Sequence, residues 1–381
     1  MKEVFYSIYA VMFHIFRILP LKLNKICFLS PHSENFRDSL GAVMEEAVLR
    51  DDFYIVKAVS KLDIDKSSAK KLFSSVLNAL KFFTVDAYHL ATSKYIFLND
   101  NFMPMAKLNF KKQAVVTQLW HAEGVFKKFG LHLNLPDDIR ALAREGSKRL
   151  TYVVCSSPDV ADIYGEAFDV PKEKVLPLGA PRTDWFYKEI NEKRLRQDFD
   201  RQYPECKGKK LVLYAPTFRD DPADDGSLLE NIDIKAFNDR FPDSRLLVRL
   251  HPQVHTCVDN LTDATDVSGY DDVRKLIRLS DILITDYSSI CMDFALLEKP
   301  VYFYAFDLEK YASDRAFYYD YESYVPGPVA RDFQTLLNLM NSNVSKTYEN
   351  RRDGFVRKNF GTVEGNASKR VVDRIIYNKE I

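Results

Sequence analysis

The chain has 381 residues, of which 46% are hydrophobic and 13% aromatic, and its 54 basic residues balance 54 acidic ones. This length and composition can supply the cores of two ordinary domains, which excludes wholesale disorder. A formal net charge of zero argues against binding of nucleic acid through overall electrostatic attraction, and we expect no nucleic-acid partner. The five cysteines lie far apart without metal-ligand spacing, as is typical of a reduced cytoplasmic protein, so we expect no metal site.

The first 20 residues predict an amphipathic helix. Apolar residues dominate from Val4 to Leu19, and helical spacing gathers the polar residues on one narrow stripe. The segment is too short and too interrupted to be expected as a transmembrane span, which needs about 20 apolar residues. The pattern leaves two interpretations open, a helix packed on the domain core and an interfacial helix lying on a membrane. The polar stripe consists of Glu3, Ser7, His14 and Arg17.

Short apolar strands alternate with helical segments along almost the whole chain. The expected strands are 25–29, 53–59, 95–98, 114–119, 152–156, 175–177, 211–215, 245–250, 282–285 and 301–303. This alternation predicts an α/β fold with two doubly wound, Rossmann-like domains whose parallel sheets face a central cleft. The polar run 191–210 is the predicted junction, so we expect an N-terminal domain over 21–200 and a C-terminal domain over 205–381.

Polar residues follow four predicted strands in the second half of the chain. Because the carboxyl ends of parallel strands lie along one edge of a sheet, side chains just past them can share one ligand. Cationic donors, hydroxyls and a helix that begins after Ser289 suit a pyrophosphate, and there is no Walker A lysine loop. The residues expected to converge are Thr217, Arg219, His251, Ser288, Ser289 and Arg315.

Each of these residues also has an ordinary structural interpretation. His251, directly before a proline, could be a turn histidine, and Asp286 with the two serines could simply cap a helix. Arg219 and Asp220 could form a surface ion pair of little consequence, and Arg315 could be a solvated arginine. The ligand hypothesis therefore rests on several such residues at successive strand ends.

A comparable loop follows the predicted strand 114–119 in the first half. His121, just past the strand end, is placed to act as a general base. Lys127 and Lys128 would neutralise phosphate, and the neighbouring glycines would let the backbone bend closely around a ligand. Arg182 belongs to a second loop expected to face phosphate, for which a simple Gly-Pro turn is the alternative.

Six motifs occur in a fixed order over residues 115–330. They are Trp-His-Ala-Glu-Gly with Lys-Lys-Phe-Gly (120–130), Gly-Ala-Pro-Arg-Thr-Asp (179–184), Tyr-Ala-Pro-Thr-Phe-Arg-Asp (214–220), Arg-Leu-His-Pro (249–252), Ser-Asp to Thr-Asp-Tyr-Ser-Ser (280–289) and Phe-Tyr-Tyr-Asp-Tyr-Glu to Pro-Gly-Pro (317–328). This ordered set resembles the CDP-glycerol glycerophosphotransferase family of wall teichoic acid synthesis.

The resemblance implies a GT-B-type fold without a metal-binding DxD motif, and roles for individual residues. His121 would deprotonate the acceptor hydroxyl, and His251 would hold or protonate the departing phosphate. The implied donor pyrophosphate ligands are Arg315, Ser288 and Ser289, with Asp286 and Thr217 shaping the same site. No cofactor is required, although Mg²⁺ accompanying the nucleotide is left open.

The insertion of Ala122 and Glu123 before Gly124 resembles the primase branch of the family. That branch implies transfer of glycerol phosphate from CDP-glycerol to an undecaprenyl-diphosphate-linked ManNAc-GlcNAc disaccharide, with release of CMP. The alternatives are a polymerising glycerol- or ribitol-phosphate transferase, a nucleotide-sugar glycosyltransferase on the same fold, and a membrane-recruited scaffold without catalysis.

The resemblance also implies a peripheral protein on the cytoplasmic face of the cell membrane, held there by the N-terminal helix. Basic residues could then lie on anionic lipid, or they could belong to a solvated charged face. They are Lys107, Lys111, Lys112, Lys127 and Lys128. Whether the protein forms a homo-oligomer is left open.

Overall fold

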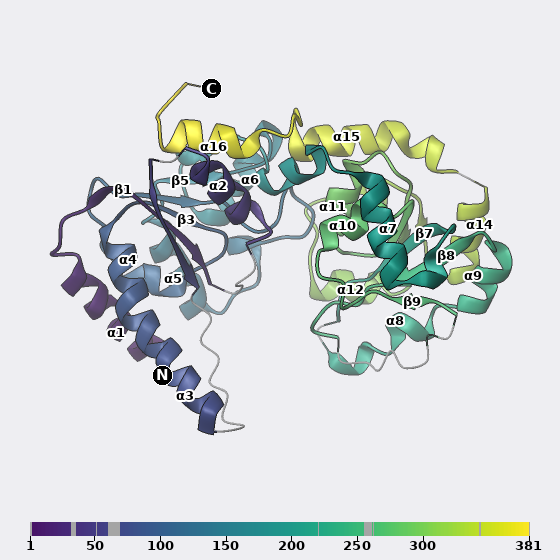
Figure 1. Cartoon of the computed structure of the whole chain (residues 1–381), viewed down its shortest axis with the longest axis horizontal. Helices are drawn as coiled ribbons and strands as arrows, with labels where there is room; N and C mark the ends of the chain where they lie inside the picture. The colour runs from purple at the N-terminus through teal and green to yellow at the C-terminus, as the bar shows by residue number, and fades with distance from the viewer. Residues whose placement is uncertain are drawn as a thin grey trace. The chain divides into compact units, whose positions relative to one another are not determined.

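The computed structural model divides the chain into two compact units. It describes residues 2–31, 36–50, 52–59, 69–219, 221–254, 261, 263–342 and 344–380. Unit 1 comprises Met1–Trp185 and Lys358–Ile381, and unit 2 comprises Phe186–Arg357 (Figure 1). Each unit is built on a parallel sheet, so the predicted α/β fold with two parallel-sheet domains is confirmed. The cleft between the domains stays a prediction.

The sheet of unit 1 has six parallel strands in the order β2-β1-β3-β4-β5-β6. Strand β1 is buried from Lys25 to Ser30, as expected of a strand that is covered on both faces. The strands are β1 (Lys22–Ser30), β2 (Tyr54–Val59), β3 (Ser93–Leu98), β4 (Val115–Gln118), β5 (Tyr152–Val154) and β6 (Val175–Leu176).

The helices of unit 1 cover both faces of this sheet (Figure 1). They are α1 (Lys2–Phe16), α2 (Ser39–Val48), α3 (Ala69–Lys81), the π-helix η1 (Phe82–Asp86), α4 (Ala87–Thr92), α5 (Asp137–Ser147), α6 (Ala161–Phe168) and α16 (Ala367–Ile375). Short 3₁₀ turns are η2 (Met103–Lys107), η3 (Gly130–His132), η4 (Pro158–Val160) and η5 (Lys172–Lys174). One core joins strands β1 and β3 to α2 and α16 through Phe28, Phe97, Leu40 and Val372.

The sheet of unit 2 has six parallel strands in the order β12-β11-β10-β7-β8-β9. Read from its other edge, this is the Rossmann order, in which the first and fourth strands of the unit are neighbours. The strands are β7 (Lys210–Ala215), β8 (Ser244–Val248), β9 (Thr265–Asp266), β10 (Ile282–Thr285), β11 (Val301–Tyr304) and β12 (Val329–Ala330). The two-residue edge strands β9 and β12 were not among the predicted strands.

The helices of unit 2 also lie on both faces of their sheet (Figure 1). They are α7 (Glu192–Gln202), α8 (Ser227–Glu230), α9 (Ile234–Arg240), α10 (Val273–Leu279), α11 (Ile290–Ala295), α12 (Leu308–Asp314), α13 (Tyr321–Tyr324) and α14 (Phe333–Asn341), with 3₁₀ turns η7 (Pro204–Cys206), η8 (Pro222–Asp224) and η9 (Val344–Tyr348). The turn η6 (Pro181–Tyr187) and α15 (Glu349–Phe360) contain the points where the chain passes between units.

The domain limits differ from the predicted ones at both ends. The polar run predicted as a junction forms α7 of unit 2, where Arg278 binds Glu192 and the backbone carbonyls of Phe186 and Lys188. At the C-terminus, α16 returns to unit 1, because Asp184 accepts hydrogen bonds from the first N–H groups of this helix. Polarity alone could not show that a charged helix belongs to a domain rather than a linker.

The N-terminal helix α1 shows features of both interpretations that the sequence left open. Tyr9 and Phe13 are fully buried, and Tyr9 packs against the rings of Phe82 and Phe102. The opposite face, which carries Val4, Ile8, Val11 and Ile15, is exposed. Within the described parts of the chain, every helix is too short or too polar to span a bilayer.

Candidate active site

The carboxyl ends of β7 and β10 meet at the point in unit 2 where the strand order reverses direction. Thr285, the last residue of β10, lies in register with Ala215, the last residue of β7. Connections on the two sides of such a point run in opposite directions, and this is where open α/β sheets bind ligands. Thr217 and Asp286, two of the predicted residues, are the second and first residues beyond these strand ends.

Asp286 ties the two strand ends together. Its Oδ1 accepts hydrogen bonds from the N–H of Thr217, at 2.8 Å, and from its neighbour Tyr287. The residue is 1% exposed, and burial raises the pKa of its carboxyl group although the Arg219 guanidinium acts in the opposite direction. Asp286 and Thr217 therefore join the two strand ends at this edge, and their role in shaping a donor site stays a prediction.

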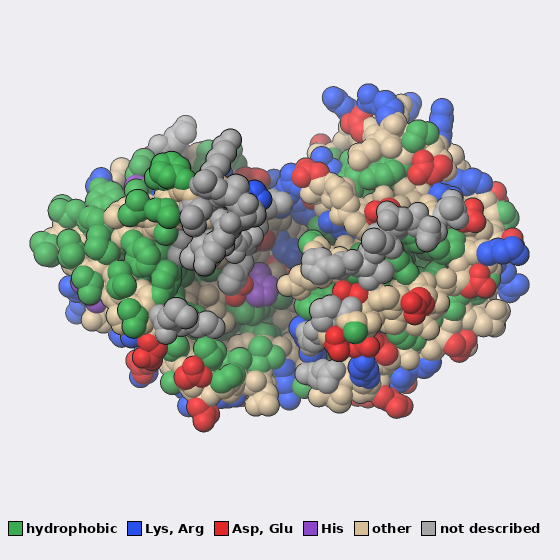
Figure 2. Space-filling model, turned by 90° about the horizontal axis from the view of Figure 1, so that it is seen from below, with side chains coloured by type: hydrophobic (Ala, Val, Ile, Leu, Met, Phe, Trp, Pro, Cys, Tyr) green, Lys and Arg blue, Asp and Glu red, His purple; other side chains and the backbone are tan. Residues whose placement is uncertain are grey.

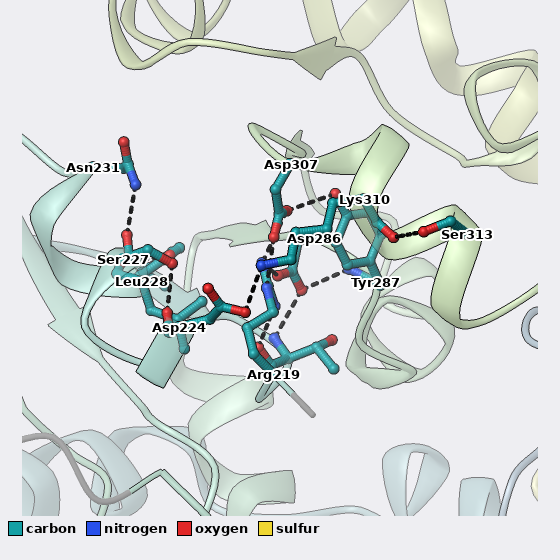
Figure 3. Close-up of polar contacts among 12 residues, drawn as sticks. Arg219, Asp224, Ser227, Leu228, Asn231, Asp286, Tyr287, Asp307, Lys310 and Ser313 are labelled. Carbon is teal, nitrogen blue, oxygen red and sulfur yellow. Dashed lines mark hydrogen bonds and ion pairs between the residues drawn. The ribbon is translucent and has the colours of Figure 1, made fainter. Parts of the chain in front are cut away.

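Arg219 is held inside unit 2 by two carboxylates (Figure 3). Its Nε donates to Asp307 Oδ2 at 2.7 Å, and its Nη2 lies 3.1 Å from Asp307 Oδ1 and 3.0 Å from Asp286 Oδ2. Tyr287, whose hydroxyl donates to Asp307 at 2.9 Å, and Tyr311 cover the guanidinium with their rings. Burial opposes the charge, but the two carboxylates prevail and raise the pKa of Arg219 above its usual value.

This geometry gives Arg219 an internal role. At 7% exposure it is not a surface residue, so the alternative of a surface pair with Asp220 is wrong for Arg219; Asp220 itself lies outside the described residues. Its charge is already matched by Asp286 and Asp307, whereas the predicted donor contact required a cation available to phosphate. That contact stays a prediction, and the structure instead makes Arg219 the link between the loops after β7, β10 and β11.

A second group gathers around Phe218 at the same edge. The ring of His251, which follows β8, lies 4.8 Å from the Phe218 ring. The guanidinium of Arg315 lies 5.1 Å from the same ring. His251 is exposed and Arg315 is half-buried, so an imidazole and a cation share one aromatic neighbour where ligands can reach them. The structure thus brings together three loops that the sequence predicted to converge.

The serines after β10 begin helix α11. Ser288 Oγ accepts a long hydrogen bond of 3.4 Å from the N–H of Ile290, which is the capping role considered as an alternative. Ser289 is exposed and, as the residue before the helix, makes no side-chain capping bond. The helix has only six residues, so the hydroxyls rather than a long helix dipole are the relevant groups for an anion.

In unit 1, the backbone turn after β4 presents His121. Trp120 adopts a left-handed φ of 61°, and its N–H donates to Gln118 Oε1 at 2.9 Å. The His121 ring lies 4.1 Å from the buried Trp120 ring, and its Nδ1 is 3.2 Å from the Asn99 carbonyl oxygen. The His121 side chain is 47% exposed, so the predicted base is supported on one side and accessible on the other.

The rest of this loop is fixed by backbone contacts. The N–H of Gly124 donates to Ser156 Oγ at 3.0 Å, and the N–H of Val125 donates to Asn359 Oδ1 at 2.9 Å. Gly130 has a left-handed φ of 59°, and a Cβ there would lie 2.3 Å from the Ala167 carbonyl oxygen. The glycine is therefore required by close packing within unit 1, whereas the sequence analysis assigned the glycines to bending around a ligand.

Arg182 and the two lysines have different surroundings. Arg182 Nη1 lies 3.4 Å from Glu123 Oε2, and Ser39 Oγ donates to Glu123 Oε1 at 3.3 Å. Glu123, part of the insertion that distinguishes this loop, is thus buried against a predicted phosphate ligand. Lys127 and Lys128 are half-buried. Their contacts with phosphate, and that of Arg182, stay predictions.

Asp100 and Asp307 were not among the residues that the sequence analysis expected to share a ligand. Asp100 Oδ2 lies 3.4 Å from His121 Nδ1, and Asp307 anchors Arg219. Both aspartates follow a strand end by two or three residues, β3 and β11 respectively, which was the signal available in the sequence. The described residues contain no group of three or more His, Cys, Asp and Glu side chains placed to hold a metal ion.

Comparisons with known proteins show the family of this chain. The model of the family described as CDP-glycerol:poly(glycerophosphate) glycerophosphotransferase matches residues 11–377. The teichoic acid ribitol-phosphate primase of Bacillus spizizenii is 34% identical, over 94% of this chain and 92% of that protein. The teichoic acid poly(ribitol-phosphate) polymerase of the same organism is 33% identical over 98% of this chain, which spans only 60% of the polymerase.

A solved structure shows the same fold. The wall teichoic acid polymerase TagF superposes with a TM-score of 0.77 and 22% identity, covering 97% of this chain and 93% of that one. At this level of identity the match concerns the fold, which is of the GT-B type.

Proposed function

This chain belongs to the CDP-glycerol:poly(glycerophosphate) glycerophosphotransferase family, and we propose that it transfers a polyol phosphate from a CDP-polyol to a lipid-linked acceptor in teichoic acid synthesis. The observation that carries the proposal is the pair of accessible imidazoles at sheet edges, His121 in unit 1 and His251 in unit 2. The first has one ring nitrogen engaged by its own unit, and the second shares Phe218 with the cationic Arg315.

The proposed reaction is an in-line displacement at phosphorus. The acceptor oxygen attacks the β-phosphorus of the CDP-polyol, an O–P bond forms, and the bond from that phosphorus to the oxygen of CMP breaks. The hydroxyl proton passes to His121 Nε2, and CMP leaves with the electron pair of the broken bond. His251 and Arg315 stabilise the charge on the departing phosphate, with Ser288 and Ser289 as hydroxyl donors.

The polyol and the acceptor define the finer form of the proposal. We propose glycerol phosphate as the transferred group and an undecaprenyl-diphosphate-linked disaccharide as the acceptor, so that the enzyme primes the polymer. The family description names CDP-glycerol, whereas the two relatives described above are named for ribitol phosphate. Ribitol transfer is therefore a second candidate. This chain spans 60% of the length of the polymerase, and chain extension is the alternative to priming.

The reaction can be tested with the purified full chain. CDP-glycerol, CDP-ribitol and a nucleotide sugar are offered separately with a synthetic lipid-linked disaccharide, and CMP release and the mass of the lipid are measured. A gain of one glycerol phosphate supports the proposal, and several units or a ribitol phosphate would revise its finer form. Product from the nucleotide sugar alone would overturn it.

A histidine variant gives the matched control for the base. His121→Ala should lower turnover by about 10²–10⁴-fold, the usual contribution of a general base. His132, whose Nε2 lies 3.4 Å from Glu166 elsewhere in unit 1, has no proposed role. His132→Ala should retain activity, and equal losses in both variants would indicate a structural effect rather than removal of a base.

We propose that unit 1 lies on the membrane that carries the acceptor, at its cytoplasmic face. The exposed residues of α1 recur at helical spacing, and α3 exposes a second apolar stripe at intervals of three and four residues. Figure 2 shows hydrophobic side chains gathered on this face of unit 1. The stripes are Val4, Ile8, Val11 and Ile15 on α1, and Phe73, Val76, Leu77 and Leu80 on α3. Both helices contact the π-helix η1, and apolar stripes of this kind suit the boundary between head groups and acyl chains.

Two of the lysines proposed for lipid contact have partners on the N-terminal segment instead. Lys107 Nζ donates to Ser7 Oγ at 2.9 Å, and Lys111 Nζ donates to the carbonyl oxygen of Leu19. They therefore hold the N-terminal segment against the rest of unit 1. The apolar stripes rather than these charges supply the proposed attachment.

Liposome flotation tests the attachment. Val11→Asp with Ile15→Asp places two charges on the α1 stripe and should release the protein from vesicles that bind the unaltered chain. Leu49→Asp adds a charge at an exposed leucine after α2 and should leave flotation unchanged. Equal flotation of both variants would count against α1 as the attachment.

A further inference from the structure

Asp100 lies beside the proposed base because β3 and β4 are neighbours in the sheet. Leu98 and Gln118, the last residues of these strands, are in register. Asp100 is the second residue past β3 and His121 is the third past β4, so both side chains emerge at one edge of the sheet. The Asp100 Oδ2 atom lies 3.4 Å from His121 Nδ1, and the Asp100 side chain is 24% exposed.

Among the described residues, the polar groups beside His121 Nδ1 are both acceptors. The Asn99 carbonyl oxygen lies 3.2 Å from Nδ1 and the Asp100 carboxylate lies 3.4 Å from it, and both oxygens accept hydrogen bonds. In neutral imidazole one nitrogen carries the hydrogen and the other carries the lone pair. The surroundings therefore favour hydrogen on Nδ1, which leaves the lone pair on Nε2.

Gln118 fixes both partners of this pair. Its Nε2 donates to the Asp100 carbonyl oxygen at 3.2 Å, and its Oε1 accepts from the Trp120 N–H at 2.9 Å. The Asp100 Oδ1 atom accepts from the Asn101 N–H at 2.7 Å, which orients the carboxylate. One buried glutamine thus holds the loop that carries the aspartate and the loop that carries the histidine.

We propose that Asp100 is a positioning residue for His121. It keeps the hydrogen on Nδ1, points Nε2 toward the acceptor hydroxyl, and stabilises the imidazolium that forms when the acceptor proton arrives on Nε2. The aspartate behind the histidine has this effect in the Ser-His-Asp triad. The inference rests on the proposed function for the identity of the proton donor, but the tautomer it assigns exists without any substrate.

Nitrogen-15 NMR of ring-labelled histidine tests the tautomer in the substrate-free full chain. The ring signals of the seven histidines are recorded, and the His121 signals are identified by their loss in His121→Gln. We expect hydrogen on Nδ1 in the unaltered protein and a larger Nε2–H population in Asp100→Ala. An unchanged tautomer population in Asp100→Ala would overturn the proposal.

Kinetics supply the second readout. Asp100→Ala should lower kcat by about 10- to 100-fold while the KM for the CDP-polyol stays within twofold, because the donor is not bound through this pair. Asp162→Asn is the control, because Asp162 is an exposed aspartate of α6 that pairs with Lys172. If Asp100→Ala changes the tautomer but the unaltered protein has no transferase activity, the proposed function alone is refuted. If the unaltered protein is active and Asp100→Ala has the same kcat, the positioning role is refuted.

Discussion

The two units handle charge at their sheet edges in different ways. In unit 2, Asp286 and Asp307 are matched by the guanidinium of Arg219 inside the fold, and Tyr287 completes the network. In unit 1, the carboxylate of Asp100 is partly exposed and its partner is an accessible imidazole. The charges of unit 2 are thus paired inside the fold, whereas the pair in unit 1 lies where a bound molecule can reach it.

The comparison extends to the interiors of the units. Unit 1 buries Asp86 at the end of its π-helix, and among the described residues the Oδ2 atom of Asp86 has no hydrogen-bond partner. Unit 2 buries Asp286 with a guanidinium beside it. Replacing the guanidinium of Arg219 should therefore destabilise unit 2, whereas replacing the carboxyl group of Asp86 should stabilise unit 1.

The largest effect is expected from Arg219→Met. The substitution keeps much of the side-chain volume but leaves Asp286 and Asp307 together without a counter-charge, which typically costs about 3–5 kcal/mol. Both tryptophans, Trp120 and Trp185, belong to unit 1, so their fluorescence does not follow unit 2. Hydrogen exchange measured by mass spectrometry on peptides from β7 and β10 should show the loss.

Arg331→Met is the control for this measurement. Arg331 pairs with Glu322 on the surface of unit 2, where both side chains are about half exposed. Such pairs contribute about 0–1 kcal/mol, so protection of β7 and β10 should barely change. Equal protection in the two variants would contradict the idea that buried charge pairing shapes this edge.

Asp86→Asn should have the next largest effect, and it should stabilise unit 1. Burial raises the pKa of Asp86 from 3.8 to about 6, so the folded chain holds this proton more tightly than the unfolded chain. The protonated Asp86 carboxyl group therefore makes its full contribution to the stability of unit 1 below pH 3.8, and this contribution is lost as the pH rises through 6. At pH 8 the variant should therefore be more stable by about 1–3 kcal/mol.

Tryptophan fluorescence during urea unfolding reports this effect, because both tryptophans lie in unit 1. The difference between Asp86→Asn and the unaltered chain should shrink toward zero as the pH falls below 3.8, where Asp86 becomes protonated in both the folded and the unfolded state. A difference that is independent of pH would show that Asp86 is not the titrating group.

The smallest effect is expected from Glu123→Gln. The amide keeps the shape and can still accept from Ser39, but it removes the charge that faces Arg182. Loss of one such partly buried pairing should cost about 1–2 kcal/mol of unit 1 stability. Glu46→Gln is the control, since Glu46 pairs with Arg50 near the surface of α2. No difference between the two variants would mean that Glu123 contributes no more than a surface carboxylate.

Much of the fold could be predicted because parallel strands buried on both faces leave continuous apolar runs. The runs that became β1, β7 and β10 were identified from this signal. The edge strands β9 and β12 could not be, because two residues carry no periodicity. The return of α16 to unit 1 depends on Asp184 and on core contacts of Val372, which no local pattern encodes.

The candidate site could be predicted in part because residues past parallel strands share an edge. This rule brought His251 and Arg315 together correctly, since both lie against Phe218. It could not show that Arg219 would be neutralised inside the fold, because that depends on Asp307, which lies 88 positions later in the chain. Nor could it identify Asp100 as a neighbour of His121, since that requires the order of strands in the sheet.

The division of roles between the two units is tested most directly by comparing donor binding with turnover. Binding of the CDP-polyol is measured by calorimetry for His121→Ala and Arg315→Ala, together with CMP release in the presence of acceptor. The account predicts that His121→Ala binds the donor within about twofold of the unaltered chain but loses turnover by about 10²–10⁴-fold. Arg315→Ala should weaken donor binding itself. Loss of donor affinity in His121→Ala with affinity retained in Arg315→Ala would contradict the assignment of acceptor activation to unit 1 and donor binding to unit 2.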